Sequence, residues 1–303
     1  MNQDKKELWE QAIKWPLYSV VIIPISLTAT YVLNKYGSFR LINFLGFVFA
    51  AILILFWENL TNDLFDSETG VDEFKFHSIV NLVNNKYLIN AVAYFSLLSG
   101  LTLIYLIAAS TNIKILIIVI FCCFLGYLYQ GPPFRFGYLG LGEPLCWITF
   151  GPLTHSAALL AINPDNSYTS IPWKESLLIG SGPSLAITLI LFCSHFHQIH
   201  EDKKYGKNSP LVILGTSRGS ELIPWIIYII YIFQLVTIIF GFIPISCILF
   251  LISFPYGLKL INLLKYSHNK KSSIKNAKFL AVKFQTLNGV GLIIGLLFNY
   301  FFI

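Results

Sequence analysis

The chain has 303 residues, of which 55% are hydrophobic and only 12% are charged, and its formal net charge is +6. Its mean hydropathy is +0.67, and soluble globular domains carry about 25% charged residues. The composition therefore excludes a soluble domain and predicts an all-α, multi-spanning membrane protein with lipid around it and no nucleic-acid partner.

Apolar runs long enough to cross a bilayer, roughly 17 to 25 residues each, recur along the whole chain. Nine such runs lie at about residues 16–34, 41–57, 88–109, 113–129, 144–163, 176–193, 222–239, 240–258 and 280–303. The second and fourth are short, and only a break at Gly241 and Pro244 separates the seventh from the eighth. Seven to nine spans are thus compatible with the sequence, and we expect one integral-membrane domain over residues 1–303.

The positive charges are distributed unequally between the two sets of loops. With nine spans, the N-terminal segment and the loops after the second, fourth, sixth and eighth spans share one side and hold 16 of the 21 Lys and Arg residues. The opposite loops hold only Lys35, Arg40, Lys114 and Lys174, and Lys283 lies in the last span. Because Lys and Arg are retained on the cytoplasm-like side, the richer loops are predicted to face the cytoplasm or stroma.

The segment from Glu58 to Ser78, at the end of the second span, gathers six carboxylates and two asparagines. Asn62 and Asp66 are one helical turn apart and so share a face. Oxygen ligands of this kind suit Mg²⁺, which keeps several waters and is commonly shared with substrate phosphates. The alternative is that Asn62, Asp63, Asp66 and Asp72 are solvated charges near a helix end. Ionisable residues at a membrane boundary are costly, so those that are present usually serve a function.

The loop from Tyr129 to Glu143 is rich in Gly and Pro and holds one cation, Arg135. Such a run fixes turns and lets the backbone approach a ligand closely. Arg suits bidentate phosphate binding, and aromatic neighbours can line the path of an apolar chain or a developing carbocation. The alternative is an ordinary tight re-entrant loop.

A second acidic segment follows the sixth span and interleaves carboxylates with cations: Gln198, Glu201, Asp202, Lys203 and Lys207. Acidic groups next to cations can hold both a metal and the phosphate oxygens that it neutralises. On its own, the segment is equally typical of a solvated loop. Both acidic segments are predicted to lie on the same side of the membrane, which strengthens the combined interpretation.

Three histidines, His195, His197 and His200, precede this second segment. The spacing of His195 and His197 suits a strand or loop rather than one helical face, and no fourth soft ligand for zinc is nearby. We therefore expect hydrogen bonding, a general-base role or no special role for them, rather than zinc binding.

Three segments carry a family resemblance: NDLFDSETGVD, YQGPPFRFGYLGLGEPL and FHQIHEDKKYGKNSPLVILGT, in that order and separated by apolar helices. Together they resemble the UbiA-type intramembrane prenyltransferases, and most of all the phytyl-transferring 1,4-dihydroxy-2-naphthoate prenyltransferases of cyanobacteria and plastids. The similarity covers nearly the whole chain. It implies about nine helices around a central cavity, dependence on Mg²⁺, and an allylic diphosphate held by two Asp-rich motifs.

Carried over position by position, the resemblance also implies site residues. Those implied to be catalytic are Asp66, Asp72, Asp202 and Arg135. Those implied to bind the diphosphate and its metal are Asn62, Asp63, Gln198, Glu201, Lys203 and Lys207. The implied metal ligands are Asn62, Asp66, Asp72 and Asp202.

The chain departs from the family pattern in both motifs. The usual third carboxylate of the first motif falls on Gly70, so Asp72 is its displaced equivalent and Glu68 the alternative. In the second motif, Gln198 replaces the usual first Asp, and Glu201 is the candidate for the missing charge.

The resemblance implies transfer of a phytyl group from phytyl diphosphate to 1,4-dihydroxy-2-naphthoate, with loss of CO₂ and diphosphate. The product is demethylphylloquinol, an intermediate of phylloquinone (vitamin K1) biosynthesis, made in a thylakoid, inner-envelope or cyanobacterial membrane. Alternatives are a chlorophyll synthase, an enzyme with a longer prenyl tail of the menaquinone type, and a secondary transporter. A transporter is disfavoured because its ionisable residues are expected at mid-bilayer, whereas the acids here sit at loop ends.

The unequal charge distribution predicts that Lys271 and the C-terminus lie on opposite sides of the membrane. A single cysteine at Lys271 and one appended after Ile303 should be labelled by a membrane-impermeant reagent from opposite sides. The region near Lys271 should be reached from the cytoplasmic or stromal side, because it belongs to the Lys-rich set of loops. Labelling of both positions from one side would refute nine spans.

Overall fold

The computed structural model describes residues 8–10, 12–13, 15–70, 78–165, 168–274 and 276–303. This part of the chain is helical and has no strand. Its elements are η1 (Trp15–Tyr18), α2 (Ser19–Tyr36), α3 (Leu41–Thr69), α4 (Ile79–Val83), α5 (Lys86–Ser110), α6 (Lys114–Gln130), η2 (Phe136–Leu139), α7 (Gly142–Ile148), η3 (Thr149–Leu153), α8 (Thr154–Ile162), α9 (Trp173–Lys204), α10 (Pro210–Leu214), α11 (Thr216–Ile239), η4 (Ile245–Ser253), α12 (Phe254–Ser267), α13 (Lys271–Ile274) and α14 (Ala277–Phe302).

These elements supply the predicted spans in the predicted order. Eight helical stretches of the described chain are long and apolar enough to cross a membrane. Three of them are composite: η1 runs into α2 in the first span, α7, η3 and α8 form another, and η4 and α12 form a third. The helix α6, with 17 residues, is shorter and apolar. With α6 included, the described residues contain the nine membrane helices that the sequence predicted.

Two of the spans are longer than the apolar runs that mark them. The helix α3 continues from the predicted end at residue 57 to Thr69, and α9 continues from residue 193 to Lys204. Neither extension contains Gly or Pro. The helix α3 ends at Gly70, which takes a left-handed conformation with φ of 84° and donates its N–H to the Asp66 carbonyl. Both acidic segments therefore begin as helix, so the expected loop or strand around His195 and His197 was wrong.

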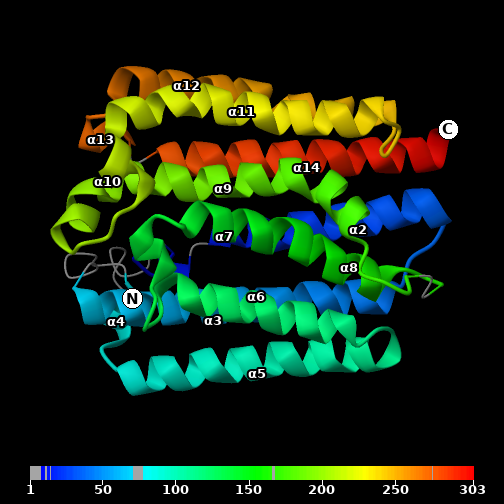
Figure 1. The fold of residues 1–303 in the computed structure, drawn as a ribbon, viewed down its shortest axis with the longest axis horizontal. Coiled ribbons are helices and arrows are strands. Elements are labelled where there is room, and N and C mark those ends of the chain that lie inside the picture. Colours follow the sequence, from blue (N-terminus) through cyan, green and yellow to red (C-terminus); the bar gives the residue numbers. More distant parts are fainter. Residues whose placement is uncertain (1–7, 11, 14, 71–77, 166–167, 275) are drawn as a thin grey trace.

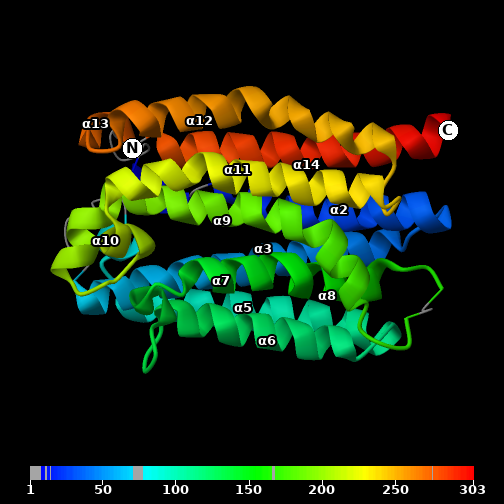
Figure 2. The same ribbon diagram turned by 45° about the horizontal axis from the view of Figure 1, so that its top comes forward.

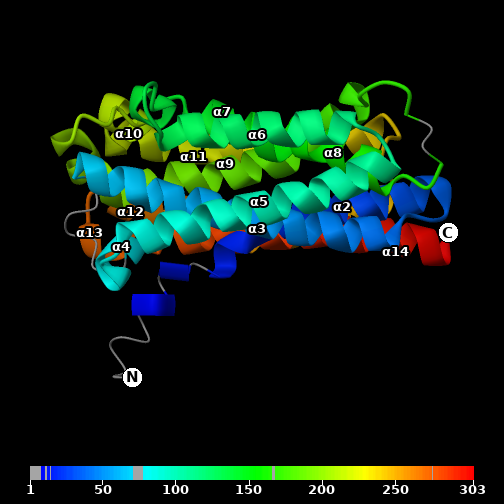
Figure 3. The same ribbon diagram turned by 90° about the horizontal axis from the view of Figure 1, so that it is seen from below.

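The polar segments gather at one end of the bundle, which we call the polar end. Figure 1 shows there the C-terminal ends of α3 and α9, the start of α14 and the short helices α4, α10 and α13. The connections after α2, α5, α8 and α11 lie at the opposite end, together with the C-terminus. In Figure 2, α11, α12 and α14 form one side of the bundle and α5 and α6 the other. From below, α3 and α5 lie side by side along most of their length (Figure 3).

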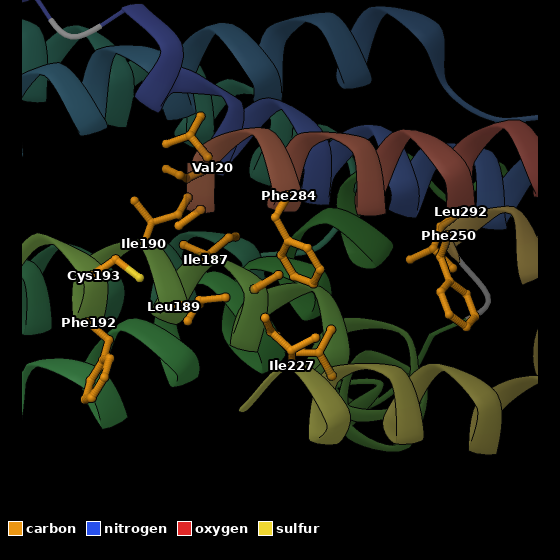
Figure 4. Packing of buried hydrophobic residues seen from close by; sticks show 14 of the residues in the cluster. Val20, Ile187, Leu189, Ile190, Phe192, Cys193, Ile227, Phe250, Phe284 and Leu292 are labelled. Atoms are coloured by element: carbon orange, nitrogen blue, oxygen red, sulfur yellow. The ribbon is translucent and has the colours of Figure 1, made fainter. Parts of the chain in front are cut away.

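Two apolar clusters hold the helices together. One includes residues of α2, α3, α8, α9, α11, η4, α12 and α14. Figure 4 shows part of it, with Ile187 and Ile190 of α9 near Val20 and with Phe284 near Ile227. The other joins α2, α3, α5, α6 and α8. The helices α2 and α3 contribute to both clusters. Together with the span α7–α8 they bound the interior between the two clusters.

The span α7–α8 is interrupted at its middle. The residues of η3 form a turn of π-helix, in which Gly151 takes non-helical angles of φ −99° and ψ −105° and is followed by Pro152. A Cβ atom at Gly151 would lie only 2.5 Å from Ser184 Oγ, so the glycine allows α9 to pack closely. Such π-bulges often occur at functional sites. Here the break places Thr149 and Phe150 in the wall of an internal cavity.

The last span packs against η4 almost backbone to backbone. Cβ atoms at Gly291 and Gly295 would lie 2.3 Å from the Leu249 carbonyl oxygen and 2.5 Å from Cys247 Cα. Glycines four residues apart form the small-residue face that lets membrane helices approach closely. Ser246 Oγ also donates a hydrogen bond of 2.6 Å to the Gly295 carbonyl.

A buried amide pair links α11 to α14. Gln234 Nε2 donates to Asn288 Oδ1 at 2.5 Å, and Asn288 Nδ2 donates to Gln234 Oε1 at 3.1 Å. Both side chains are buried, and neither water nor lipid hydrocarbon can replace the partner there.

We expect Asn288→Leu to lower the free energy of unfolding by about 1 to 2 kcal/mol, because it leaves the Gln234 amide unpaired. Thermal unfolding in detergent of Asn288→Leu, Gln234→Leu and the double variant should show a double-variant loss smaller than the sum of the single losses. Strict additivity would contradict a coupling between the two amides.

Candidate active site

Segments far apart in the sequence meet at the polar end. A Cβ atom at Gly70, just after α3, would lie 2.9 Å from Tyr205 Cε1, just after α9. The Asn208 N–H donates a 2.9 Å hydrogen bond to the Tyr138 carbonyl. This bond joins the segment after α9 to the loop from Tyr129 to Glu143, which we call the middle loop. The predicted convergence of the two acidic segments and the Gly-rich loop is therefore observed.

Asp66 is the centre of the contacts made by the first acidic segment. It is 8% exposed, and its Oδ2 accepts a hydrogen bond of 3.3 Å from Gln130 Nε2, at the end of α6. Its Oδ1 accepts a longer bond of 3.4 Å from the Tyr138 hydroxyl, which also lies 2.6 Å from Thr69 Oγ1. Asn62, one turn earlier, lines the cavity described below.

The other acids of this segment are placed differently. The Oδ2 atom of Asp63 accepts a 3.0 Å hydrogen bond from the Ile79 N–H at the start of α4. Glu68 is more than half exposed and lies 3.6 Å from Arg135 Nη2. Asp72, an expected metal ligand, lies outside the described residues, so the choice between Asp72 and Glu68 stays a prediction.

Two cations lie near the Tyr138 ring: Arg135 of the middle loop and Lys207 of the loop after α9. The guanidinium carbon of Arg135 lies 5.7 Å from the ring centroid, and Lys207 Nζ lies 5.5 Å from it. Lys207 is only 4% exposed. Burial raises the pKa of Tyr138 to about 12, so its hydroxyl remains a neutral donor at physiological pH. Arg135 and Lys207 thus lie next to the tyrosine whose hydroxyl contacts Asp66, whereas Lys203 is exposed.

The second acidic segment is tied to the middle loop through His195. The His195 Nδ1 atom lies 3.2 Å from Asp202 Oδ2, and its Nε2 lies 3.4 Å from Glu143 Oε1. The two α9 residues are seven positions apart, which is two helical turns and thus one face. Asp202 is fully buried. Gln198, one turn before Asp202, is half-buried, as is Glu201.

The atoms available for a metal at this end are oxygens. No group of three or more His, Cys, Asp or Glu side chains gathers as a metal site among the residues that the structure describes. Two buried oxygens close to the implied ligands, Gln130 Oε1 and Asp202 Oδ1, accept no hydrogen bond within the described chain. Carboxylate and amide oxygens are the ligands that Mg²⁺ prefers, so the donor set fits this ion.

A cavity leads from the polar end into the bundle. Its outer part, about 180 Å³ in volume, is lined near the polar end by Asn62 and Lys278 and farther in by Leu145. The inner part, about 90 Å³, is lined by Phe47 and Ile104, which lie toward the opposite end of α3 and α5. Both parts share the walls Leu55, Glu58, Gly126, Thr149 and Phe150.

The sequence prediction missed several side chains that the structure places at this site: Gln130, Tyr138, Glu143, Glu58 and Lys278. The sequence held a signal for Gln130, because it is a single amide at the end of the otherwise apolar helix α6. Tyr138 and Glu143 lie in the loop already singled out for its glycines and Arg135. Their partners come from α3 and α9, which no local pattern reveals.

Together these features define a class of protein: an intramembrane bundle with an oxygen-rich, cation-flanked polar end above a mostly apolar cavity. The sequence matches the model of the UbiA prenyltransferase family over residues 21–284. The chain belongs to this family and is a prenyltransferase, which confirms the resemblance.

Two relatives support this assignment. The chain is 37% identical over 286 residues to a 2-carboxy-1,4-naphthoquinone phytyltransferase of Synechocystis sp., covering 94% of this chain and 91% of that protein. It is 35% identical over 298 residues to the chloroplastic 2-carboxy-1,4-naphthoquinone phytyltransferase of Arabidopsis thaliana, covering 96% and 77%.

The solved structures show that the fold is shared. A UbiA homologue from Archaeoglobus fulgidus, bound to GPP and Mg²⁺, superposes with a TM-score of 0.60 at 13% identity, covering 94% of this chain and 99% of that one. A digeranylgeranylglyceryl phosphate synthase superposes with a TM-score of 0.57 at 16% identity, covering 97% and 99%.

We expect Asp66→Asn to lower the rate of prenyl transfer on the order of 100-fold or more, because it removes a negatively charged oxygen from the donor set that fits Mg²⁺. In Asp66→Asn the amide oxygen can still accept the hydrogen bond from Gln130, and the amide NH₂ can donate to the Tyr138 hydroxyl, so the melting temperature should change little. Asp165→Asn, in an exposed loop at the opposite end, is the matched control and should keep full activity. Near-normal turnover of Asp66→Asn would remove Asp66 from the catalytic machinery.

Proposed function

We propose that the protein transfers a phytyl group from phytyl diphosphate to 1,4-dihydroxy-2-naphthoate, with loss of diphosphate and CO₂. The observation that carries this proposal is the similarity over at least 94% of the chain to two relatives named 2-carboxy-1,4-naphthoquinone phytyltransferase. On this proposal, the protein is an enzyme of phylloquinone biosynthesis in a plastid or cyanobacterial membrane. The Lys-rich polar end would then face the stroma or cytoplasm.

The geometry of the polar end suits a diphosphate. Arg135 and Lys207 both lie near the Tyr138 ring and would supply the positive charge that the leaving diphosphate requires. The neutral Tyr138 hydroxyl can donate a hydrogen bond to a phosphate oxygen. The apolar tail of the donor would extend into the cavity among side chains such as Leu55 and Phe150.

Mg²⁺ would be held by Asn62, Asp66 and Asp202 with Asp72, and the structure adds Gln130 as a candidate ligand. When bound, the ion neutralises charge that develops on the leaving diphosphate. The protein groups orient the donor, exclude water from its allylic carbon and bind the acceptor.

The acceptor must be electron-rich at the carbon that attacks. In the dihydroxy form, the ring carbon that bears the carboxylate can form a bond to the allylic carbon while the allylic C–O bond breaks. Loss of CO₂ then returns an electron pair to the ring and restores aromaticity. Lys278 is the one cation among the described residues that line the cavity, and we assign it to the acceptor carboxylate.

The size of the outer cavity favours this acceptor over a chlorophyllide. A volume of about 180 Å³ suits a planar two-ring acid, whereas a tetrapyrrole is several times larger. The length of the prenyl tail must be measured with donors of several lengths.

The proposal predicts the products of a reconstituted reaction. Purified protein in nanodiscs, given Mg²⁺, phytyl diphosphate and carboxyl-labelled dihydroxynaphthoate, should release one labelled CO₂ for each phytylated naphthoquinol detected by mass spectrometry. Chlorophyllide in place of the naphthoate should give no product, and EDTA should stop the reaction until Mg²⁺ is added in excess. Phytylation of chlorophyllide, or prenyl transfer without CO₂ release, would overturn the assignment of the acceptor.

A further inference from the structure

Glu58 is an acidic residue inside the membrane part of the bundle. It lies on α3 one helical turn before Asn62 and two turns before Asp66, so these three side chains share a face. Unlike the other two, Glu58 is not at the polar end, because it lines the outer and the inner part of the cavity where they join. It is the one carboxylate that borders the cavity among the described residues.

The surroundings of Glu58 leave its carboxylate directed at the cavity. A Cβ atom at Gly126, on the facing helix α6, would lie 3.5 Å from Glu58 Oε1, so the carboxylate rests against a position that has no side chain. Within the described part of the chain, the Glu58 carboxylate has no hydrogen bond or ion pair, and only its backbone carbonyl accepts a side-chain hydrogen bond, from Thr61 Oγ1. This contrasts with Asp66 and Asp202, which are both held by neighbouring side chains.

An unpaired carboxylate within a bilayer is expensive and is therefore a candidate for function. A structural role would require a partner from the protein, which the described contacts do not provide. A ligand in the cavity would be such a partner. The walls of the inner part of the cavity around Glu58 are mostly apolar, as at Leu55 and Phe150, and the polar side chains among them, such as Thr149, are uncharged. Among the described lining residues, a hydroxyl group of the ligand would therefore find no other carboxylate acceptor.

We infer that Glu58 exchanges a proton with the acceptor, at the hydroxyl next to the carbon that is prenylated. This inference rests on the proposed function. As the ring carbon forms its bond to the allylic carbon and diphosphate leaves, the adjacent hydroxyl becomes a carbonyl and its proton passes to the Glu58 carboxylate.

The proton is returned in the second half of the reaction. When CO₂ leaves, the electron pair of the broken C–C bond restores the ring and places negative charge on the same oxygen, which takes the proton back from Glu58. Overall the ring exchanges CO₂ for the phytyl group, diphosphate is released, and no proton is gained or lost. Glu58 is thus a catalytic residue whose role is separate from binding of the diphosphate at the polar end.

The test uses Glu58→Gln, which keeps the shape of the side chain but cannot accept the proton. We expect the kcat for dihydroxynaphthoate to fall about 100-fold or more, the usual range for loss of a general acid–base group. The KM for phytyl diphosphate and the slow release of diphosphate without acceptor should stay within about twofold of the full-length wild-type protein, because Glu58 does not bind the diphosphate. Glu221→Gln, an exposed glutamate on α11, is the matched control and should behave as the wild type.

The outcomes separate the inference from the proposed function. If the wild type does not phytylate dihydroxynaphthoate, the proposed function fails. If it does and Glu58→Gln keeps its kcat, the inference fails. Equal loss of phytyl transfer and of acceptor-independent diphosphate release would also overturn it, because Glu58 would then act on the donor.

A second variant covers the case in which Glu58→Gln does not fold. Glu58→Asp keeps the charge but withdraws the carboxylate by one methylene, and misplacement of about 1 Å can lower a rate as much as 100-fold. We expect Glu58→Asp to lower kcat at least about tenfold with an unchanged KM for phytyl diphosphate. A wild-type kcat in Glu58→Asp would overturn the inference.

Discussion

Lipid hydrocarbon offers no hydrogen bonds, so each polar group that the bundle encloses needs a partner from another part of the protein. This constraint explains the arrangement of the interior. Gln234 and Asn288 satisfy each other between α11 and α14, and Asp66 is held by Gln130 from α6 and by Tyr138 from the middle loop. These hydrogen bonds reduce the cost of burying polar groups next to a membrane, and they also hold the side chains of the polar end in position.

The division between polar end and apolar cavity follows from the chemistry of a prenyl diphosphate. One end of this molecule carries several negative charges and the other is a hydrocarbon, so a single site must offer oxygen ligands and cations next to an apolar channel. The helices α3 and α9 achieve this because each continues beyond its apolar run into an acidic final segment. The same helix therefore contributes wall to the bundle and ligands to the site, and no flexible hinge separates the two.

The spans and the location of the site follow from local patterns that the sequence displays. Hydropathy located all nine membrane helices of the described chain, and the spacing of Asn62 and Asp66 predicted a shared helical face. The sequence prediction placed the ends of α3 and α9 too early, because it ended each helix where the apolar run ends. Backbone hydrogen bonding continues past the first charged residues, and α3 stops only at Gly70. The partners of Asp66 and Asp202 and the exposure of Glu58 to the cavity were not predictable, since they depend on contacts between α3, α6, α9 and the middle loop that only the folded bundle creates.

The close packing of α14 against η4 has a consequence for the assembly of the protein during synthesis. Gly291 and Gly295 allow this helix to dock backbone to backbone, and the same helix brings Lys278 to the mouth of the cavity and packs against α2 and α9. Of the described spans, α14 emerges last from the ribosome. The packing of α14 on α2 and α9, and the Lys278 side chain in the cavity wall, therefore depend on the last described span to be synthesised. The wall of the cavity is complete only after that helix has inserted.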